Sequence, residues 1–333
     1  MWTHAEFVRN VIYNEETAVA YLREKNLLDD PEVVAINCDK CGSVMKNKRR
    51  KVKGSFVPVM RCPVKGCQTF KSARTGNSFF HYSDLNNKTN CKLSLCQILD
   101  IVYFFVCETP IKYAEVITGR SHSTLVDWYN MCREVCTKIV QQKGQMVGTT
   151  TEPIQIDEAR FAGRRKYNRG RLLQGNLGPE STDSEAEIEN NRNHGNRIDG
   201  PWVFGLKKGL DCRYFFVDRR DRNTLLPIII RECAQGSVIH SDEWPAYGTL
   251  NSHGFLHSTV NHQRHYVDPN TGTHTQSIER SWLDAKIKIL LTMRGTAIHM
   301  LQSHLDEYCY RMMRKESVDL YSDFLNDIRE VYR

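Results

Sequence analysis

Residues 153–161 read "PIQIDEARF" and residues 237–244 read "SVIHSDEW". Each stretch is a short apolar run that predicts a buried strand, and an acid ends the run, Asp157 in the first and Asp242 in the second. A carboxylate buried alone is unfavourable, so an acid at the end of an apolar strand caps a backbone turn or holds a cation. Because strands alternate with helical segments around both stretches, they predict an α/β fold for the second half of the chain.

A third acid, Glu279, lies in "GTHTQSIERSWLDAK" (272–286). The spacing of Thr273 and Gln276 predicts a capping box that starts a helix. Apolar residues recur after it at spacings of four and three, which predicts one helix face packed on the sheet. Glu279 and Lys286 are seven apart and share a side of that helix.

Two strand ends and one following helix that converge on a point are typical of a ribonuclease-H-like core, a mixed sheet flanked by helices. Three carboxylates at that point would provide the hard oxygen ligands that Mg²⁺ or Mn²⁺ prefers. Two such ions per active site, about 3.5–4 Å apart, would support an in-line phosphoryl displacement. Any one of the acids taken alone is more simply structural.

The segments between the acids have recognisable patterns. "WVFGLKKG" and "CRYFFVDRR" predict a hairpin around residues 208–211, and "NTLLPIIIREC" predicts a helix despite Pro227. Residues 174–200 are polar and acidic without hydrophobic period, which indicates an inserted loop. The region 275–333 reads as helical throughout.

Four of the twelve cysteines form two close pairs, Cys38-x2-Cys41 and Cys62-x4-Cys67. Two pairs on two turns, separated by a hairpin-length spacer, are typical of a zinc ribbon with four thiolate ligands. The alternative is four unrelated buried cysteines. Cys91 and Cys96 are spaced less suitably for the same metal, and the remaining thiols indicate a reducing compartment.

Two patterns in the first half of the chain are typical of DNA binding. "KNKRRKVK" (46–53) has six basic residues in eight and predicts a phosphate-contacting hairpin tip or a nuclear-import signal, with Lys48, Arg49, Arg50 and Lys51 as the contacts; a solvated tip is the alternative. Residues 93–135 have helical period broken by Thr109-Pro110 and by a glycine-containing turn at 118–121, which fits a helix-turn-helix. Its second helix, capped by Ser121 or Ser123, would present His122, Ser123 and Thr124 to a major groove; three helices packed without DNA are the alternative.

A further basic run follows Asp157. "RRKYNRGR" (164–171) carries Arg164, Arg165, Lys166, Arg169 and Arg171, and so many charges beside the acids would neutralise a DNA backbone, unless the run is only a solvated loop. Among the histidines, His274 is the best functional candidate, as a contact to the scissile phosphate. A second zinc site at His253-x3-His257 or His262-x2-His265 has no cysteine partner to support it.

The bulk composition sets outer bounds. A chain of 333 residues predicts two or three domains, and a net charge of +7 is mild enough that its distribution matters more than its sum. The longest apolar run, "ILDIVYFFVC" (98–107), is about half the roughly 20 residues of a membrane span and predicts a buried helix. The N-terminal residues do not resemble a signal peptide.

Several long motifs, taken together, resemble a known family. These are "IDEARFAGRRKYNRGR", "WVFGLKKG", "VIHSDEWPAYGTL", "HSTVNHQRHYVDPNTGTHTQSIERSWLDAKIKI" and "YCYRMM". They resemble the ISXO2-like DDE transposases, and within these the Merlin transposases of eukaryotic DNA transposons, relatives of the bacterial IS1016-type elements. The resemblance implies catalytic acids at Asp157, Asp242 and Glu279 that hold divalent metal ions, and a catalytic lysine at Lys286. The structural zinc expected from the cysteine spacing completes the predicted cofactors.

The resemblance also implies an organisation and a function. The expected domains are an N-terminal helical segment (1–36), a zinc ribbon (37–80), a helix-turn-helix domain (81–145), an RNase H-like DDE domain (150–295) with its insertion, and C-terminal helices (296–333). The expected function is cut-and-paste transposition in the nucleus by a homodimer or higher synaptic assembly on transposon-end and target DNA, with no membrane partner. The alternative is a host-recruited DNA-binding protein that no longer transposes.

Overall fold

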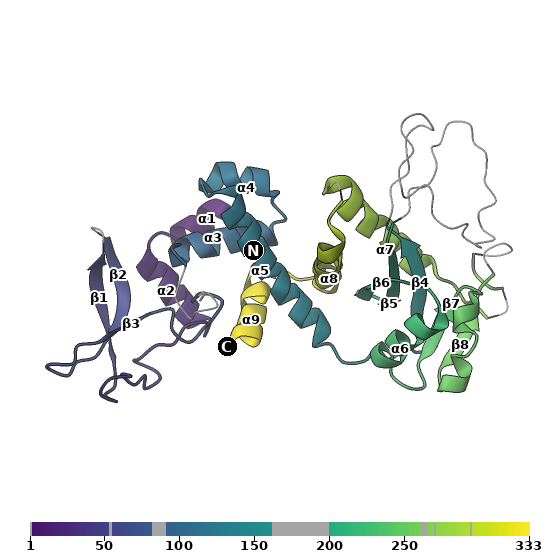
Figure 1. The fold of residues 1–333 in the computed structure, drawn as a ribbon, viewed down its shortest axis with the longest axis horizontal. Helices are drawn as coiled ribbons and strands as arrows, with labels where there is room; N and C mark the ends of the chain where they lie inside the picture. The colour runs from purple at the N-terminus through teal and green to yellow at the C-terminus, as the bar shows by residue number, and fades with distance from the viewer. Residues whose placement is uncertain are drawn as a thin grey trace. The chain divides into compact units, whose positions relative to one another are not determined.

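The computed structural model describes residues 2–52, 55–81, 91–161, 200–261, 266–269, 271–293 and 295–333. The chain divides into two compact units (Figure 1). The first contains Met1–Ile139 together with Glu316–Arg333, and the second contains Val140–Lys315. Within the described residues, no helix combines the length and the apolar character needed to cross a membrane.

The first unit contains a small antiparallel sheet in the order β1-β2-β3, with strands Lys46–Val52, Ser55–Arg61 and Phe70–Ser72. Its small core combines two of the paired cysteines with two methionines, Met45 and Met60. The basic run 46–53 lies mostly in β1. The described side chains of this strand alternate between the two faces of the sheet.

Helices make up the rest of the first unit: α1 (His4–Asn10), α2 (Glu15–Glu24), α3 (Leu95–Val106), α4 (Ile111–Thr118), α5 (His122–Gln141) and α9 (Leu320–Tyr332). The apolar run lies in α3 as predicted, except for Cys107, which is the C-cap, and a Ser94 capping box starts the helix. The Phe324 ring of α9 packs on the Phe105 ring of α3, with 5.5 Å between the centroids. The last helix thus belongs to the core of the N-terminal unit.

A glycine turn joins α4 to α5. Gly119 has φ 64°, the left-handed conformation that ends a helix with little strain when no Cβ is present. The Ser121 hydroxyl accepts a hydrogen bond from the Thr124 amide at 3.4 Å, so Ser121 caps α5, one of the two caps predicted.

The second unit is built on a mixed five-stranded sheet in the order β6-β5-β4-β7-β8. The strands are β4 (Ile154–Arg160), β5 (Trp202–Lys208), β6 (Asp211–Val217), β7 (Val238–Ser241) and β8 (Leu256–Thr259). β4, β5 and β6 form an antiparallel meander, with the predicted hairpin closing at Lys208 and Asp211. β7 and β8 then continue the sheet in parallel beside β4.

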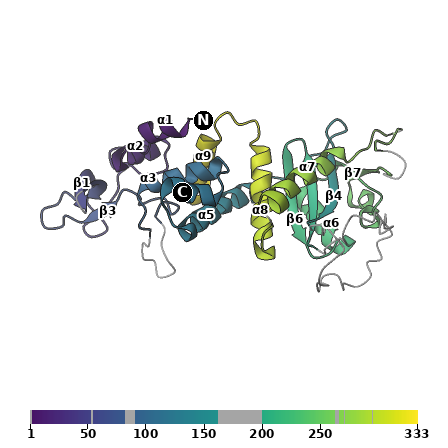
Figure 2. The same cartoon turned by 90° about the horizontal axis from the view of Figure 1, so that it is seen from above.

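Helices flank this sheet, as predicted from the sequence (Figures 1 and 2). α6 (Arg222–Glu232) contributes Leu225 and Ile229 to the core that contains Ile154 and Ile156 of β4. Asp221 caps α6, and the helix continues through Pro227 as expected. Burying side chains of this size contributes about 1.5–3 kcal/mol each.

α7 (Gln276–Lys286) and α8 (Ile298–Met313) also pack on this sheet. The residues between 275 and 333 are not one continuous helical region: Gly295 adopts φ 89°, and residues 314–319 separate α8 from α9. The predicted capping box is also wrong, since the N-cap is Thr275 and makes no side-chain cap bond.

One glycine determines how closely α7 approaches the sheet. A Cβ on Gly205 of β5 would lie 2.6 Å from two ring carbons of Trp282 in α7. The indole instead stacks on Tyr214 of β6, with 4.2 Å between the centroids. The missing side chain at 205 thus makes room for the largest side chain of α7.

We predict that Gly205→Ala lowers the free energy of unfolding by about 1–3 kcal/mol, because a buried methyl group would overlap the indole. Gly248→Ala is the matched control, since a Cβ there would come no closer than 3.5 Å to any atom. Urea unfolding of the full chain, followed by tryptophan fluorescence, measures both. Equal stability of the two variants would contradict this account of the packing.

Candidate active site

Asp157 and Asp242 lie side by side on neighbouring parallel strands. Gln155 of β4 pairs with His240 of β7, and each aspartate lies two residues further along the chain, Asp157 within β4 and Asp242 just after β7. β7 ends at Ser241, whereas β4 continues to Arg160 against β5. The sequence suggested that Asp157 ends its strand, and this was wrong. Asp157 lies inside β4, at the point where the parallel pairing with β7 has stopped and the antiparallel pairing with β5 continues.

Trp282 fixes the carboxylate of Asp157. Its indole Nε1 donates a hydrogen bond to Oδ2 of Asp157 at 2.9 Å. Asp157 is paired across the ladder with Gly205, so the same bare position accommodates the ring and brings its N–H to the acid. The apolar periodicity of this helix predicted that one face packs on the sheet, but it gave no sign of this hydrogen bond.

Glu279 lies in the first turn of α7, and its side chain is exposed. The Thr275 hydroxyl donates to Oε1 of Glu279 at 2.9 Å, which restricts the carboxylate. An acid in the first turn is also stabilised by the positive end of the helix dipole. Thr275 thus orients the third acid instead of capping the helix.

Gln155 ties the start of α7 to the sheet. Its Oε1 accepts a hydrogen bond from the Ile278 amide at 3.0 Å, and its Nε2 lies 3.2 Å from Nδ1 of His274. Because Oε1 is the acceptor, Nε2 donates to the histidine, and a neutral His274 ring carries its proton on Nε2. Sequence reasoning missed Gln155, although a glutamine two residues before Asp157 shares its strand face.

The acids interact strongly. Burial and the negative charge of Asp242 raise the pKa of Asp157 to about 7, Glu279 adds to this effect, and the Trp282 hydrogen bond opposes it. A cation at the same place would reverse these effects. Among the described residues, the four paired cysteines form the group whose ligand atoms all lie within 4.8 Å of one another, and the three carboxylates do not form such a group.

A fourth acid, Glu158, lies on the opposite face of β4. The hydroxyl of buried Tyr247 donates to its Oε1. Burial raises the pKa of Glu158 to about 8; the Tyr247 bond lowers it, and the charges of Asp157 and Asp242 raise it further. Alternation along the strand could have found this acid, since it immediately follows Asp157.

Lys286 and His274 lie at the two ends of this helical segment. Lys286, the last residue of α7, places Nζ 5.8 Å from the centroid of the Phe161 ring. The His274 amide donates to Nδ1 of His240 at 3.4 Å, which joins the residue to β7 as well as β4. Nε2 of His257 lies 2.8 Å from the Ser241 hydroxyl, and no histidine of the described ranges belongs to a metal-binding cluster.

The predicted DNA contacts are accessible where they are described. Lys48, Arg49, Arg50 and Lys51 are exposed on β1; Arg49 pairs with Glu16 at 2.8 Å, and the Arg50 guanidinium lies 5.0 Å from the Phe70 ring centroid.

At the start of α5, His122 and Ser123 are exposed and Thr124 is half-buried. Nδ1 of His122 lies 3.1 Å from a carboxylate oxygen of Glu115. The five basic residues predicted beside Asp157, Arg164, Arg165, Lys166, Arg169 and Arg171, lie outside the described residues.

The four paired cysteines converge, and their Sγ atoms all lie within 4.8 Å of one another. Sγ of Cys38 is 3.7 Å from that of Cys67, and Sγ of Cys41 is 3.4 Å from that of Cys62. A tetrahedral zinc site with Zn–S bonds of about 2.3 Å has sulfurs roughly 3.8 Å apart, so the group fits the metal.

Backbone amides already favour thiolates in this cluster. The Lys40 and Cys41 amides lower the pKa of Cys38 to about 6, and hydrogen bonds from Ser43 lower that of Cys41. Burial instead raises the pKa of Cys62 to about 12. That thiol therefore ionises only beside a cation, which is the role a structural zinc ion would have.

We expect the purified protein to contain about one zinc ion per chain, and Cys62→Ser to lose it, because three thiolates close the site poorly. Cys107→Ser, which removes an exposed cysteine elsewhere in the same unit, is the control and should retain the metal. Elemental analysis of the two variants and of the unaltered protein measures this. Full zinc content in Cys62→Ser would refute the assignment.

We also expect Mn²⁺ at about ten times its dissociation constant to raise the Tm of the second unit by about 2–4 °C. The reason is that the ion binds the three acids in the folded state and not in the unfolded state. Asp157→Asn should abolish the rise, since it removes one ligand charge but retains an oxygen that can accept the Trp282 bond. Glu152→Gln, an exposed acid just before β4, should preserve it. Calorimetry of the zinc-loaded full chain tests this, and an undiminished shift in Asp157→Asn would show that Mn²⁺ binds elsewhere.

Comparison with known proteins gives a family match for the domain that contains these acids. No curated protein matches the chain. Residues 150–312 match the family model of the ISXO2-like transposase domain. This range contains the whole mixed sheet, α7 and the acids Asp157, Glu158, Asp242 and Glu279. The match supports the assignment of this domain to the ISXO2-like DDE transposases, a family that uses divalent metal ions to act on DNA.

Proposed function

We propose that this protein is a cut-and-paste DNA transposase, closest to the Merlin group, whose catalytic acids are Asp157, Asp242 and Glu279. The observation that carries the proposal is the convergence of β4, β7 and α7, which bring the three acids into electrostatic contact within the matched domain. The strand order, with an antiparallel meander followed by parallel strands, supports an RNase H-like core. The hydrogen bonds from Trp282 and Thr275 orient two of the acids, which further supports a functional role for them.

The proposed reaction has two steps. Water attacks the phosphorus of a phosphodiester at the transposon end, and the bond to the 3′ oxygen breaks to leave a free 3′-hydroxyl. That hydroxyl then attacks a phosphodiester of target DNA, forms a new phosphodiester and releases a target 3′-hydroxyl. Two Mg²⁺ or Mn²⁺ ions held by the acids would activate the attacking oxygen and stabilise the leaving one.

The residues around the acids have distinct roles in this proposal. Trp282 and Thr275 hold the Asp157 and Glu279 carboxylates in orientation through their hydrogen bonds. With Nδ1 of His274 accepting from Gln155, its Nε2–H is left to donate to a scissile phosphate oxygen. Lys286 would contact the DNA backbone, as the basic residues 164–171 would.

DNA recognition is assigned to the first unit. The four cysteines would hold a zinc ribbon that presents Lys48, Arg49, Arg50 and Lys51 to phosphates. The pair α4–α5 with its left-handed Gly119 turn supports a helix-turn-helix that presents His122, Ser123 and Thr124. The domain boundaries expected from the sequence are retained in this proposal, as are a nuclear location and a dimer or higher assembly that pairs two transposon ends.

The test uses purified zinc-loaded protein, Mg²⁺ and a duplex that carries the terminal repeat flanking its own coding sequence. We predict that Asp242→Asn lowers both cleavage and joining by at least about 100-fold, as loss of a group that stabilises transition-state charge does. Glu243→Gln, the adjacent exposed acid that accepts a hydrogen bond from Asn261, should retain activity.

Gel analysis of labelled product strands measures both steps, and filter binding measures DNA affinity separately. Unchanged cleavage in Asp242→Asn would reject the assigned acids. Tight binding of the terminal repeat without any cutting or joining by the unaltered protein would instead favour a recruited DNA-binding protein.

A further inference from the structure

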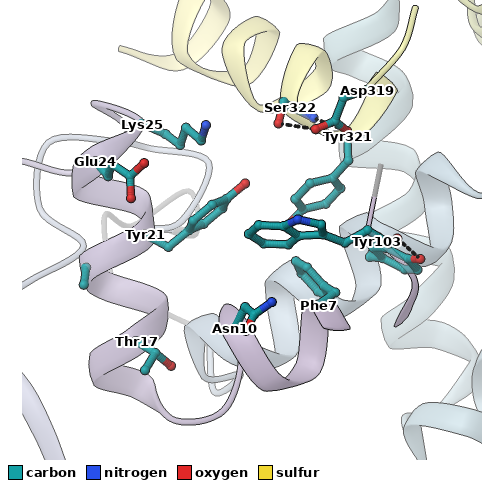
Figure 3. A pocket seen from close by; sticks show the side chains of 12 residues that line it. Phe7, Asn10, Thr17, Tyr21, Glu24, Lys25, Tyr103, Asp319, Tyr321 and Ser322 are labelled. Carbon is teal, nitrogen blue, oxygen red and sulfur yellow. Dashed lines mark hydrogen bonds between the residues drawn. The ribbon is translucent and has the colours of Figure 1, made fainter. Parts of the chain in front are cut away.

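A cavity of about 490 Å³ opens in the first unit, among residues of α1, α2, α3 and α9 (Figure 3). It is remote in sequence from the acids, and no residue of the second unit lines it. Five of its lining residues are aromatic: Trp2, Phe7, Tyr21, Tyr103 and Tyr321. Figure 3 shows the rings of Tyr21, Tyr321 and Phe7 on different sides of another lining ring.

The aromatic wall is held in place by packing on the core. Phe7, Tyr103 and Tyr321 are almost completely buried, and the centroid of the Phe7 ring lies 4.8 Å from that of Tyr103 and 5.0 Å from that of Tyr321. The Tyr103 hydroxyl donates to the carbonyl oxygen of Trp2 at 2.9 Å, and the Trp2 and Tyr21 rings have centroids 6.0 Å apart. Trp2 is 43% exposed and Tyr21 is half-buried, so these two rings are the most accessible of the five to a ligand.

The charges around the cavity favour a cation. Two acids, Glu24 and Asp319, line it against one lysine, Lys25, whose Nζ lies 5.7 Å from the Tyr21 ring centroid. Burial raises the pKa of Tyr21 to about 12, a hydrogen bond with Ser322 opposes this, and the negative charges of Asp319 and Glu24 add to it. Aromatic faces and carboxylates therefore present negative potential together.

We propose that this cavity binds the methylated ammonium group of a lysine side chain in a basic segment of a partner protein. The accessible faces of Trp2 and Tyr21 would provide cation–π attraction to a quaternary ammonium, and a methylated cation loses less hydration on entry than a free ammonium does. Glu24 and Asp319 at the wall would pair with the cation or with neighbouring basic residues of the segment. The transposase would thereby be tethered to proteins that carry this modification.

The same features disfavour other occupants. A nucleotide could stack on the rings, but its phosphate would meet two carboxylates. A purely apolar side chain would fill the space without using either acid. The two carboxylates therefore favour the proposed cationic ligand over a nucleotide and over an apolar side chain.

The experiment measures binding of the zinc-loaded full chain to fluorescent basic peptides that differ at one position: trimethyllysine, its uncharged tert-butyl carbon isostere, or unmodified lysine. We expect the trimethyllysine peptide to bind at least about threefold more tightly than the neutral isostere, the difference that a cation–π contact produces. Tyr21→Leu should weaken its binding at least about threefold, and Glu24→Gln, at an exposed position, should weaken it without affecting folding. Tyr13→Leu, which alters a tyrosine that is 73% exposed outside the cavity, is the matched control and should leave binding unchanged.

Circular dichroism and melting of each variant show that the helices of the first unit remain folded. Equal binding of the trimethyllysine and isostere peptides, or equal loss in Tyr21→Leu and Tyr13→Leu, would overturn the proposal. Choline alone binding as tightly as the peptide would overturn the peptide as occupant, and a single-stranded oligonucleotide whose binding depends on Tyr21 would assign the cavity to base stacking. Because the experiment measures peptide binding, it tests the cavity independently of any catalytic activity.

Discussion

The indole of Trp282 occupies the space that Gly205 leaves on the sheet, and from there it hydrogen-bonds Asp157. This single arrangement joins α7 to the meander, sets the distance between helix and strands, and orients one acid. Glu279 lies almost one turn before Trp282 on the same helix, so the position of the indole also determines where the third carboxylate can reach. A side chain at 205, or a smaller residue at 282, would leave the helix free to shift and the acids without a common site.

The strand order gives the acids their second constraint. Parallel pairing of β4 with β7 places Asp157 and Asp242 at equal heights, and the end of β7 at Ser241 frees Asp242 from the ladder. Burial, followed by repulsion between these two half-buried carboxylates, raises the pKa of Asp157. This destabilisation is confined to one place, and an apolar core stabilises the rest of the sheet. Such a local conflict between stability and charge is typical of a site that binds a cation.

The sequence predicted those features that depend on local pattern. Apolar runs ending in acids identified β4 and β7, cysteine spacing identified the four thiols that converge, and helical period identified α7. Pairings between distant residues escaped prediction. Nothing in the spacing links Gln155 to Ile278 or Tyr247 to Glu158, because these contacts form only when the strands and helices are packed. The capping box failed for a related reason: Thr273 has the right spacing to Gln276, but the chain starts the helix at Thr275, whose hydroxyl is engaged by Glu279. Periodicity likewise predicted α9 but not that it would pack on α3.

We propose that Asp157, Asp242 and Glu279 hold a pair of divalent cations at the junction of β4, β7 and α7. The most direct measurement is anomalous diffraction from crystals of the full chain with Mn²⁺ and transposon-end DNA. We predict two manganese peaks about 3.5–4 Å apart beside Asp157, Asp242 and Glu279, with Trp282 still hydrogen-bonded to Asp157. Manganese peaks elsewhere, or a structure in which Glu279 stays in solvent while DNA occupies the site, would contradict the account.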